Sequence, residues 1–218
     1  MSPYAFTGDQ SEPRCGLCRR MEPPFARAVA YGSYDGGLRE LIHLLKYEQV
    51  RPAARVLGRM LAEVIAGLQS EFECPVVVVP VPLHVGKLRQ RGFNQSELIT
   101  RAALKQLAAG TQMILNAAVL DRRRETQSQI GLTRHQRREN VRGAFAVAKP
   151  DEVSGREVLL VDDVFTTGTT VSECARILRR AGGSKVWVAT VARTLKLDAV
   201  HVQSDAEIEA RMTMAAAG

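Results

Sequence analysis

The sequence predicts an α/β protein with a mostly parallel, twisted sheet flanked by helices. Residues 76–82, 158–161 and 186–192 are apolar runs rich in β-branched side chains, typical of strands buried on both faces. Segments with helical spacing of apolar residues lie between these runs. The chain has 218 residues and is 45% hydrophobic, enough for one substantial core. Strands that alternate with helices favour parallel pairing through right-handed crossovers.

The first part of the chain combines an irregular start with a strand and two helices. Residues 1–26 are rich in proline, glycine and polar side chains without a period, which indicates a loop. Residues 28–34 are apolar and lead into "DGG", which indicates a strand and a turn. From Leu38 to Leu45, apolar residues recur at helical spacing, and Pro52 suits the first turn of a second helix. The apolar positions of that helix are Val56, Leu57, Met60, Leu61, Val64, Ile65 and Leu68.

The middle of the chain continues with a helix and a short strand after the run VVVVPVP. Asn94 is the predicted N-cap of the helix, and Glu97 stands three residues later, where a capping box has its carboxylate. We expect this helix to run to about Ala109. Residues 117–120 indicate a short strand.

The last third contains a long polar segment before the elements that complete the sheet. Residues 122–142 are basic and show little periodicity, and long segments of this kind in compact domains are usually functional. Residues 144–148 predict a strand, and residues 171–181 predict a helix that a Gly-Gly pair closes. Periodicity ends after Leu197, so we expect residues 198–218 to form a frayed tail.

The stretch VLLVDDVFTTGTT carries the most specific chemistry. Asp162 and Asp163 follow a buried strand, and ligands of open parallel sheets bind outside the carboxyl ends of strands. Residues 166–170 are rich in hydroxyls and lead into a helix N-terminus, which favours a bound phosphate. Gly168 lets the backbone come close to a ligand or take a positive φ. The stretch has no GK[ST] and is therefore not a Walker A loop.

The two aspartates suit a sugar better than a phosphate, because carboxylates aimed at the phosphate would repel it. We interpret them as acceptors for the vicinal hydroxyls of a ribose whose 5′-phosphate lies at the threonine loop. A divalent cation such as Mg²⁺ would also find suitable oxygen ligands nearby. The alternative interpretation is a pair of helix-capping aspartates followed by a threonine-rich turn.

Four segments together resemble a known family. VLLVDDVFTTGTT (158–170) is similar to the phosphoribosyl-diphosphate (PRPP) binding motif of type I phosphoribosyltransferases. YDGGLRELIHLLKY (34–47), VPVPLHVGKLRQRGFNQSELI (79–99) and RRRETQSQIGLTRHQRRENVRGAF (122–145) resemble the ComF family of competence-related and GntX-like proteins. The resemblance extends from about Tyr31 to Arg193. It implies a type I phosphoribosyltransferase-like fold over residues 27–197, with a flexible hood segment.

The resemblance also implies roles for individual residues. Asp162 and Asp163 would act in catalysis and bind the ribose hydroxyls of PRPP. The 5′-phosphate would bind at Thr166, Thr167, Gly168, Thr169 and Thr170. The diphosphate would lie near Pro82, Leu83, His84, Lys87, Arg89 and Arg91. Backbone donors and cations in these places would stabilise a diphosphate leaving group.

The basic segment 122–142 falls where such enzymes carry a hood. Its candidate residues are Thr126, Gln129, Arg134 and Arg138. A hood that closes over the substrate would exclude water, which would otherwise compete for the oxocarbenium-like ribosyl group.

Several of these residues also have a non-functional interpretation. His84 is equally compatible with an exposed loop, and Gln127 and Gln129 with solvated side chains. Lys46 has the alternative of a helix lysine whose ammonium extends to solvent.

The four cysteines give a weak signal. Cys74 and Cys174 suit packing positions, and Cys15 and Cys18 form the single CxxC pair. A structural zinc site usually takes four ligands, and members of the resembled family carry two CxxC pairs in an N-terminal zinc ribbon. We therefore expect residues 1–26 to be a loop or a remnant of such a ribbon, with Cys15 and Cys18 as its only candidate Zn²⁺ ligands.

The charge pattern points to anionic partners. The formal net charge is +7, and many arginines and lysines cluster between Lys87 and Arg142. Each of these residues alone is compatible with a solvated face, whereas the cluster favours anion binding. No apolar run reaches the about 20 residues of a membrane helix, and no secretory signal is apparent, so we expect a cytoplasmic protein.

Two functions remain after this reading. The first is an Mg²⁺-dependent transfer of phosphoribose from PRPP to an unidentified acceptor with release of diphosphate. The second is a non-catalytic protein that binds PRPP, or that contacts single-stranded DNA during DNA uptake. Segment 122–142 lacks the aromatic side chains on which single-stranded bases stack, which favours the metabolite. We also consider a homodimer, for which the sequence specifies no interface.

Overall fold

The structure is a computed structural model that describes residues 4–7, 22–73, 75–107, 112–126 and 134–194. The strands are β1 (Tyr4–Thr7), β2 (Arg27–Ser33), β3 (Val76–Pro80), β4 (Met113–Leu115), β5 (Leu120–Arg122), β6 (Phe145–Val147), β7 (Glu157–Phe165) and β8 (Lys185–Arg193). The α-helices are α1 (Gly36–Tyr47), α2 (Ala53–Leu68), α3 (Val85–Arg91), α4 (Gln95–Leu104), α5 (Arg134–Val141) and α6 (Thr169–Arg180). Two 3₁₀ turns, η1 (Gln69–Glu71) and η2 (Pro150–Glu152), complete the described elements.

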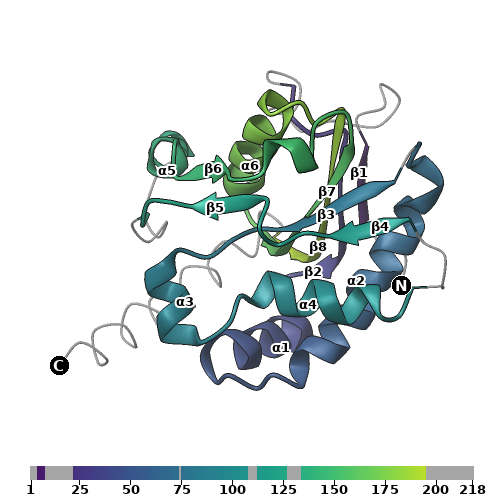
Figure 1. Cartoon of the computed structure of the whole chain (residues 1–218). Helices are drawn as coiled ribbons and strands as arrows, with labels where there is room; N and C mark the ends of the chain where they lie inside the picture. Colours follow the sequence, from purple (N-terminus) through teal and green to yellow (C-terminus); the bar gives the residue numbers. More distant parts are fainter. Residues whose placement is uncertain (1–3, 8–21, 74, 108–111, 127–133, 195–218) are drawn as a thin grey trace.

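A six-stranded sheet forms the centre of the molecule in the order β1-β2-β8-β7-β3-β4 (Figure 1). The pairs β2–β8, β8–β7, β7–β3 and β3–β4 are parallel, and β1 pairs antiparallel with β2 at one edge. Strands β5 and β6 form a separate antiparallel hairpin. The parallel sheet confirms the predicted class.

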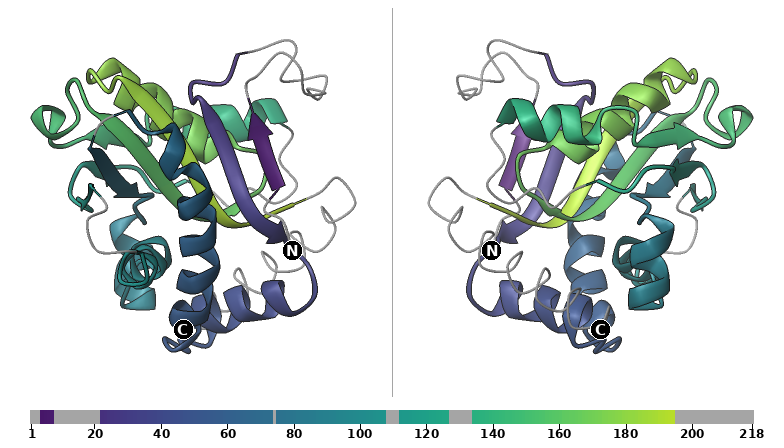
Figure 2. Two further views of the ribbon diagram at one scale, coloured as in Figure 1. Left: turned by 90° about the vertical axis from the view of Figure 1, so that its right-hand side faces the viewer. Right: turned by 90° about the vertical axis from the view of Figure 1, so that its left-hand side faces the viewer.

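Alternate residues of the central strands face two hydrophobic cores. In β7, Leu159 and Val161 pack with residues of α1, α2 and α4, whereas Val158 and Leu160 pack with α6 and the β5–β6 hairpin. Figure 2 shows these helices on opposite sides of the sheet. Burial of both faces explains why the central strands read as continuous apolar runs.

Several elements differ from the sequence-based prediction. The start of the chain contributes β1, although residues 1–26 lack periodicity. The polar segment 122–142 contains α5, and the strand expected at 117–120 lies at Leu120–Arg122 instead. The strand predicted at 158–161 is β7. It continues beyond Val161 to Phe165, because its residues keep pairing with β8.

Helix α3 was not predicted. It begins after His84, whose ring accepts a hydrogen bond from Gly86 N at 3.3 Å, and it ends at Gly92 in the left-handed conformation. Its apolar residues Val85 and Leu88 are exposed, so hydrophobic periodicity gave no signal.

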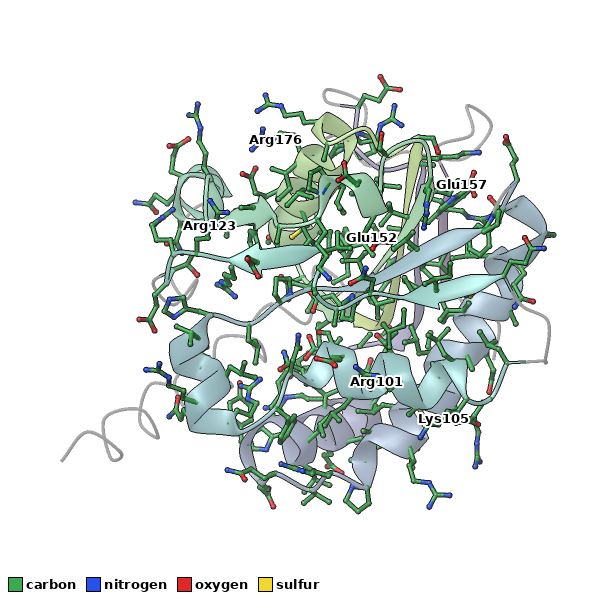
Figure 3. All side chains as sticks on the ribbon, viewed as in Figure 1. Arg101, Lys105, Arg123, Glu152, Glu157 and Arg176 are labelled. Atoms are coloured by element: carbon green, nitrogen blue, oxygen red, sulfur yellow. The ribbon has the colours of Figure 1, made fainter. Side chains whose placement is uncertain are left out.

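Helix α4 confirms half of the predicted capping box. The Asn94 side chain accepts a hydrogen bond from Ser96 N at 3.0 Å. Glu97 instead accepts hydrogen bonds from the Arg101 guanidinium, at 2.7 and 2.9 Å, on the exposed side of the helix (Figure 3). The helix ends at Leu104, and Ala109 lies outside the described residues.

Helices α2 and α4 approach closely at Gly58. A Cβ atom at this position would lie 2.5 Å from Ala102 Cβ and 3.0 Å from the α4 backbone. The close approach lets α4 pack against the sheet, where Ser96 in its first turn contacts Asp162 of β7.

We expect Gly58→Ala to destabilise the protein by about 1–3 kcal/mol, because the added methyl group forces α4 outward. Gly67→Ala is the matched control in the same helix, where a Cβ atom would meet nothing within 4 Å. That variant should gain about 0.5–1 kcal/mol from helix propensity. Urea unfolding of both variants tests this. An equal gain from both would contradict the close packing.

Candidate functional site

The candidate site lies where β7 extends beyond the end of its neighbour β3. Pairing between these strands ends at Pro80 opposite Val161, whereas pairing of β7 with β8 continues to Phe165 opposite Arg193. Asp162 and Asp163 therefore lie within β7, at the carboxyl end of β3. The backbone of β7 is open on the β3 side at this point, which is where open parallel sheets place ligands.

Local hydrogen bonds orient both carboxylates. Asp162 Oδ1 accepts from Ser96 Oγ at 3.0 Å and from Asp163 N at 2.9 Å. Asp163 Oδ1 accepts from Val164 N at 2.8 Å. The Ser96 contact connects the first turn of α4 to β7, although the two residues are 66 positions apart.

Lys46, in the last turn of α1, reaches the buried aspartate. Its Nζ lies 2.8 Å from Asp163 Oδ2, and the two side chains are 18% and 7% exposed. This corrects the alternative reading of Lys46 as a solvent-directed helix lysine. The ion pair neutralises one of two adjacent carboxylates, which reduces the repulsion between them.

The two carboxyl groups differ in acidity as a result. Burial and the neighbouring Asp163 carboxylate raise the pKa of Asp162 to about 7. Burial alone would raise the pKa of Asp163 too, but the Lys46 ammonium outweighs it and lowers that pKa. Burial would lower the pKa of Lys46, and the Asp163 carboxylate reverses this and raises it.

A pocket of about 170 Å³ opens beside the aspartate pair. Its lining residues are Lys46, Tyr47, Val81, Pro82, Leu83, Lys87, Arg91, Gln95, Arg122, Asp162, Asp163 and Thr170. The cations among them come from α1, α3 and β5, whereas both carboxylates come from β7. The pocket thus gathers charges of both signs from elements far apart in the sequence.

The predicted diphosphate residues divide into two groups. Pro82, Leu83, Lys87 and Arg91 line the pocket. His84 and Arg89 do not. The His84 ring caps α3, and its Nδ1 lies 3.9 Å from Glu125 Oε2.

The threonine loop turns into α6 next to the pocket. Gly168 is the N-cap of α6 with φ 72°, so the positive φ that the sequence allowed is present. A Cβ atom there would lie 2.6 Å from the Phe165 ring. Thr167 Oγ1 and Thr169 Oγ1 share a hydrogen bond of 2.7 Å, and Thr170 is the residue of the loop that lines the pocket.

Four polar pocket residues were not predicted as site residues. These are Lys46, Tyr47, Gln95 and Arg122. Gln95 accepts a hydrogen bond from Arg91 at 2.7 Å, and the Arg91 guanidinium lies 5.7 Å from the centre of the Tyr47 ring. Arg122 lies 5.3 Å from the centre of the Phe145 ring and donates to Thr126. The motifs YDGGLRELIHLLKY and FNQSEL contain three of them, but only the tertiary fold brings these motifs to β7.

The structure describes some of the predicted hood residues and neither of the predicted zinc ligands. Thr126 is buried beside Arg122, and Arg134 and Arg138 lie on α5. Gln129, Cys15 and Cys18 lie outside the described residues.

Comparison with known proteins identifies the family. A model of the phosphoribosyl transferase domain matches residues 95–209. The chain is 36% identical over 183 residues to the DNA utilization protein YhgH of Escherichia coli (strain K12), with 83% of this chain and 78% of that protein covered. It is 32% identical over 182 residues to competence protein F of Haemophilus influenzae, with 82% and 78% covered. The chain belongs to the ComF family of phosphoribosyl transferase domain proteins.

The match to the phosphoribosyl transferase domain and the mostly parallel sheet confirm the type I phosphoribosyltransferase-like fold that the sequence of this ComF-family chain predicts. A phosphoribosyltransferase from Corynebacterium diphtheriae is 18% identical in sequence, with a TM-score of 0.38 over 79% of this chain and 87% of that chain. Within the described ranges, no helix is long and apolar enough to cross a membrane. The same residues contain no group of three or more His, Cys, Asp or Glu side chains that could hold a metal by themselves.

The raised pKa of Asp162 predicts a pH-dependent stability. The folded protein holds the Asp162 proton between about pH 4, the unfolded value, and about pH 7. The contribution of this group is therefore present at low pH and lost as pH rises through about 7. Asp162→Asn stays neutral, so its Tm should exceed that of wild type by about 2–4 °C at pH 8, and the difference should shrink steadily on acidification and disappear near pH 4.

Thermal unfolding at the two pH values measures this effect. Asp151→Asn, at an exposed position in η2, is the control and should show no such difference. A Tm difference of Asp162→Asn that is the same at both pH values would contradict the assignment.

Proposed function

We propose that the chain binds PRPP with Mg²⁺ and transfers its phosphoribosyl group to an acceptor nucleophile, with release of diphosphate. The observation that carries this proposal is that the β7 aspartates and cations from α1, α3 and β5 line the same pocket. A ribose needs acceptors for its hydroxyls, and a diphosphate needs cations and N–H donors. Both sets of groups border the same space.

The ribose would bind at the aspartate pair. Asp162 Oδ1 is held by Ser96 and by the backbone, and no hydrogen bond from the described residues reaches Asp162 Oδ2. This oxygen is available to a ribose hydroxyl. The carboxylate would also stabilise positive charge that develops on the ribosyl group during transfer.

The diphosphate would bind between α3 and β5. Lys87 and Arg91 line the pocket from α3, and Arg122 lines it from the hairpin. The Arg91 and Arg122 side chains are held by Gln95 and Thr126, so less side-chain entropy is lost on binding. Guanidinium groups suit the planar, bidentate recognition of phosphate oxygens.

The 5′-phosphate would bind at the start of α6. Helix N-termini offer unpaired N–H groups and a favourable dipole to anions. The positive φ of Gly168 turns the backbone into this helix, and Thr170 faces the pocket. In this proposal the 5′-phosphate and the diphosphate would lie on either side of the aspartates.

Mg²⁺ fits this site as a partner of the diphosphate. The ion is usually held by one or two carboxylates together with substrate phosphates. Asp162 is the carboxylate that would hold it, because Asp163 is paired with Lys46. When bound, Mg²⁺ neutralises charge on the diphosphate and improves it as a leaving group.

A DNA-related role is the second candidate. The relatives named DNA utilization protein and competence protein F support it, as do the exposed Arg123, Arg124 and Arg142 at the hairpin. Figure 3 shows Arg123 at the outer end of the hairpin. Binding of single-stranded oligonucleotide through these cations would weaken steeply with salt, and a flat dependence of log K on log salt would remove this candidate.

PRPP binding is tested by titration calorimetry in the presence of Mg²⁺. At pH 8, where Asp162 is ionised, we expect wild type and Asp151→Asn to bind alike, and Asp162→Asn to bind at least about 10-fold more weakly, because a hydroxyl loses a charged acceptor. Equal affinity of wild type and Asp162→Asn would sink the assignment of the ribose site.

Transfer is tested by diphosphate release. We expect release from PRPP only when a suitable acceptor is present in a panel of nucleobases, amines and inorganic nucleophiles. Release should fall by about 10²-fold or more in Arg122→Met, because a cation at the leaving group stabilises the transition state. PRPP binding without release under any condition would favour the non-catalytic binding protein.

A further inference from the structure

The hairpin that carries Arg122 belongs to a small sheet of its own. Strands β5 and β6 pair with each other, in a two-stranded sheet separate from the six-stranded one. Arg122 stands opposite Phe145 in this hairpin, and its guanidinium lies 5.3 Å from the centre of the Phe145 ring. Apolar packing holds the hairpin on α6, but the hydrophobic effect is not directional. Hydrogen bonds to neighbouring elements therefore determine where the hairpin places Arg122.

The junction between α5 and β6 receives such hydrogen bonds from two distant side chains. Gly143 has a φ of 68°, the left-handed conformation in which helices often end. Its N–H donates to Glu173 Oε1, on α6, at 3.0 Å. The Arg124 guanidinium donates to Asn140 O at 2.9 Å and to Arg142 O at 3.0 Å. Side chains from α6 and from the segment after β5 thus hold this junction through its backbone.

Glu173 is a buried, ionised carboxylate in the second turn of α6. The residue is 9% exposed, and its two oxygens accept from Arg176 Nε at 2.9 Å and Arg176 Nη2 at 2.6 Å. Figure 3 shows Arg176 beside α6. Burial alone would raise the pKa of Glu173, but the hydrogen bonds from Arg176 and Gly143 N outweigh it and lower this pKa. Because hydrogen bonds to an ionised acceptor are stronger than neutral ones, the Glu173 contact fixes the junction firmly.

The contact between Glu173 and Gly143 connects two walls of the pocket. On the α6 side, Thr170 lines the pocket and stands three residues before Glu173. On the hairpin side, Gly143 stands two residues before Phe145, which pairs with Arg122. Glu173 itself lies outside the described lining of the pocket. An effect of Glu173 on ligand binding would therefore act through the position of other residues.

We propose that Glu173 is a positioning residue that, through Gly143 N, holds the β5–β6 hairpin so that Arg122 meets the diphosphate group of the ligand. This inference rests on the proposed function and adds a residue outside the pocket to it. Replacement of Glu173 leaves all the pocket side chains present. It releases the hairpin from α6, so the Arg122 guanidinium samples positions away from the diphosphate.

A purely structural role of Glu173 makes a different prediction. If Glu173 only stabilised the fold, its replacement would lower Tm, and the folded protein would bind PRPP and ribose 5-phosphate in the wild-type ratio. If Glu173 positions Arg122, its replacement weakens PRPP selectively, because ribose 5-phosphate has no diphosphate. The effect should also vanish when Arg122 is already replaced, since residues that act through one contact are not additive.

Calorimetry with Mg²⁺ measures both ligands. Glu173→Met should weaken PRPP by about 5- to 20-fold and ribose 5-phosphate by less than about 2-fold. Glu173→Gln keeps an oxygen that accepts from Gly143 N, so it should recover most of the PRPP affinity. In an Arg122→Met background, Glu173→Met should cost less than about a further 2-fold. The matched control is Glu152→Met, because Glu152 also lies near an arginine but its side chain is 44% exposed (Figure 3). It should behave like wild type.

Hydrogen exchange of the Gly143 amide in wild type tests the same coupling without a variant. Coupling between two sites is reciprocal, so diphosphate that binds at Arg122 should strengthen the contact of Gly143 N with Glu173. Saturation with inorganic diphosphate and Mg²⁺ should slow exchange of this amide by about 5-fold or more in NMR spectra, whereas ribose 5-phosphate should leave it unchanged. This measurement decides the matter if Glu173→Met does not fold.

Three results would overturn the inference and leave the proposed function intact. They are equal weakening of both ligands by Glu173→Met, an additive loss in the double variant, and unchanged exchange of the Gly143 amide in wild type saturated with diphosphate. Failure of wild type to bind PRPP would remove the proposed function as well.

Discussion

The unequal pairing of β7 is the constraint on which the site depends. Its partner β3 stops at Pro80, whereas its other partner β8 continues opposite it to Arg193. Strand β7 therefore extends beyond β3, which leaves a step in the sheet against which α4 packs. The side-chain amide of Asn94, the N-cap of α4, donates a hydrogen bond to Val81 O at 3.0 Å. Asn94 thus connects the end of β3 to the start of α4. This connection positions Ser96 so that its hydroxyl donates a hydrogen bond to Asp162. A change in strand length here would displace the whole pocket.

Separate contacts hold the negative and the positive side chains of the pocket. The carboxylates share one strand and would repel each other, and Lys46 relieves this by pairing with Asp163. Asp162 keeps Oδ2 without a hydrogen bond from the described residues and has a raised pKa. Its ionised form therefore lowers the stability of the fold, and a bound ligand or metal would offset this loss. The cations that face the carboxylates come from α3 and β5, and contacts with Gln95 and Thr126 hold Arg91 and Arg122 in place. Electrostatic preorganisation of this kind is what group transfer with a charged leaving group requires.

Local signals in the sequence predicted the fold and part of the site. The run VVVVP, the Asn94 cap and the Gly168 turn each have a short-range physical cause, and each is present in the structure. Helix α3 was missed because its ends are set by His84 and Gly92 rather than by apolar periodicity. Lys46 and Arg122 were missed as pocket residues because their proximity to Asp162 arises from packing between distant segments. Glu97 shows the opposite error, since its local pattern fits a capping box and its side chain binds Arg101 instead.

The central claim is that a phosphorylated ribose binds at the step beside β7. A crystal structure of the protein with PRPP and Mg²⁺ tests it most directly. The account predicts ribose hydroxyls within about 3 Å of Asp162 Oδ2, the 5′-phosphate at the start of α6, and the diphosphate beside Lys87, Arg91 and Arg122. Electron density for PRPP elsewhere on the surface, with the aspartates in contact only with Lys46 and Ser96, would contradict it.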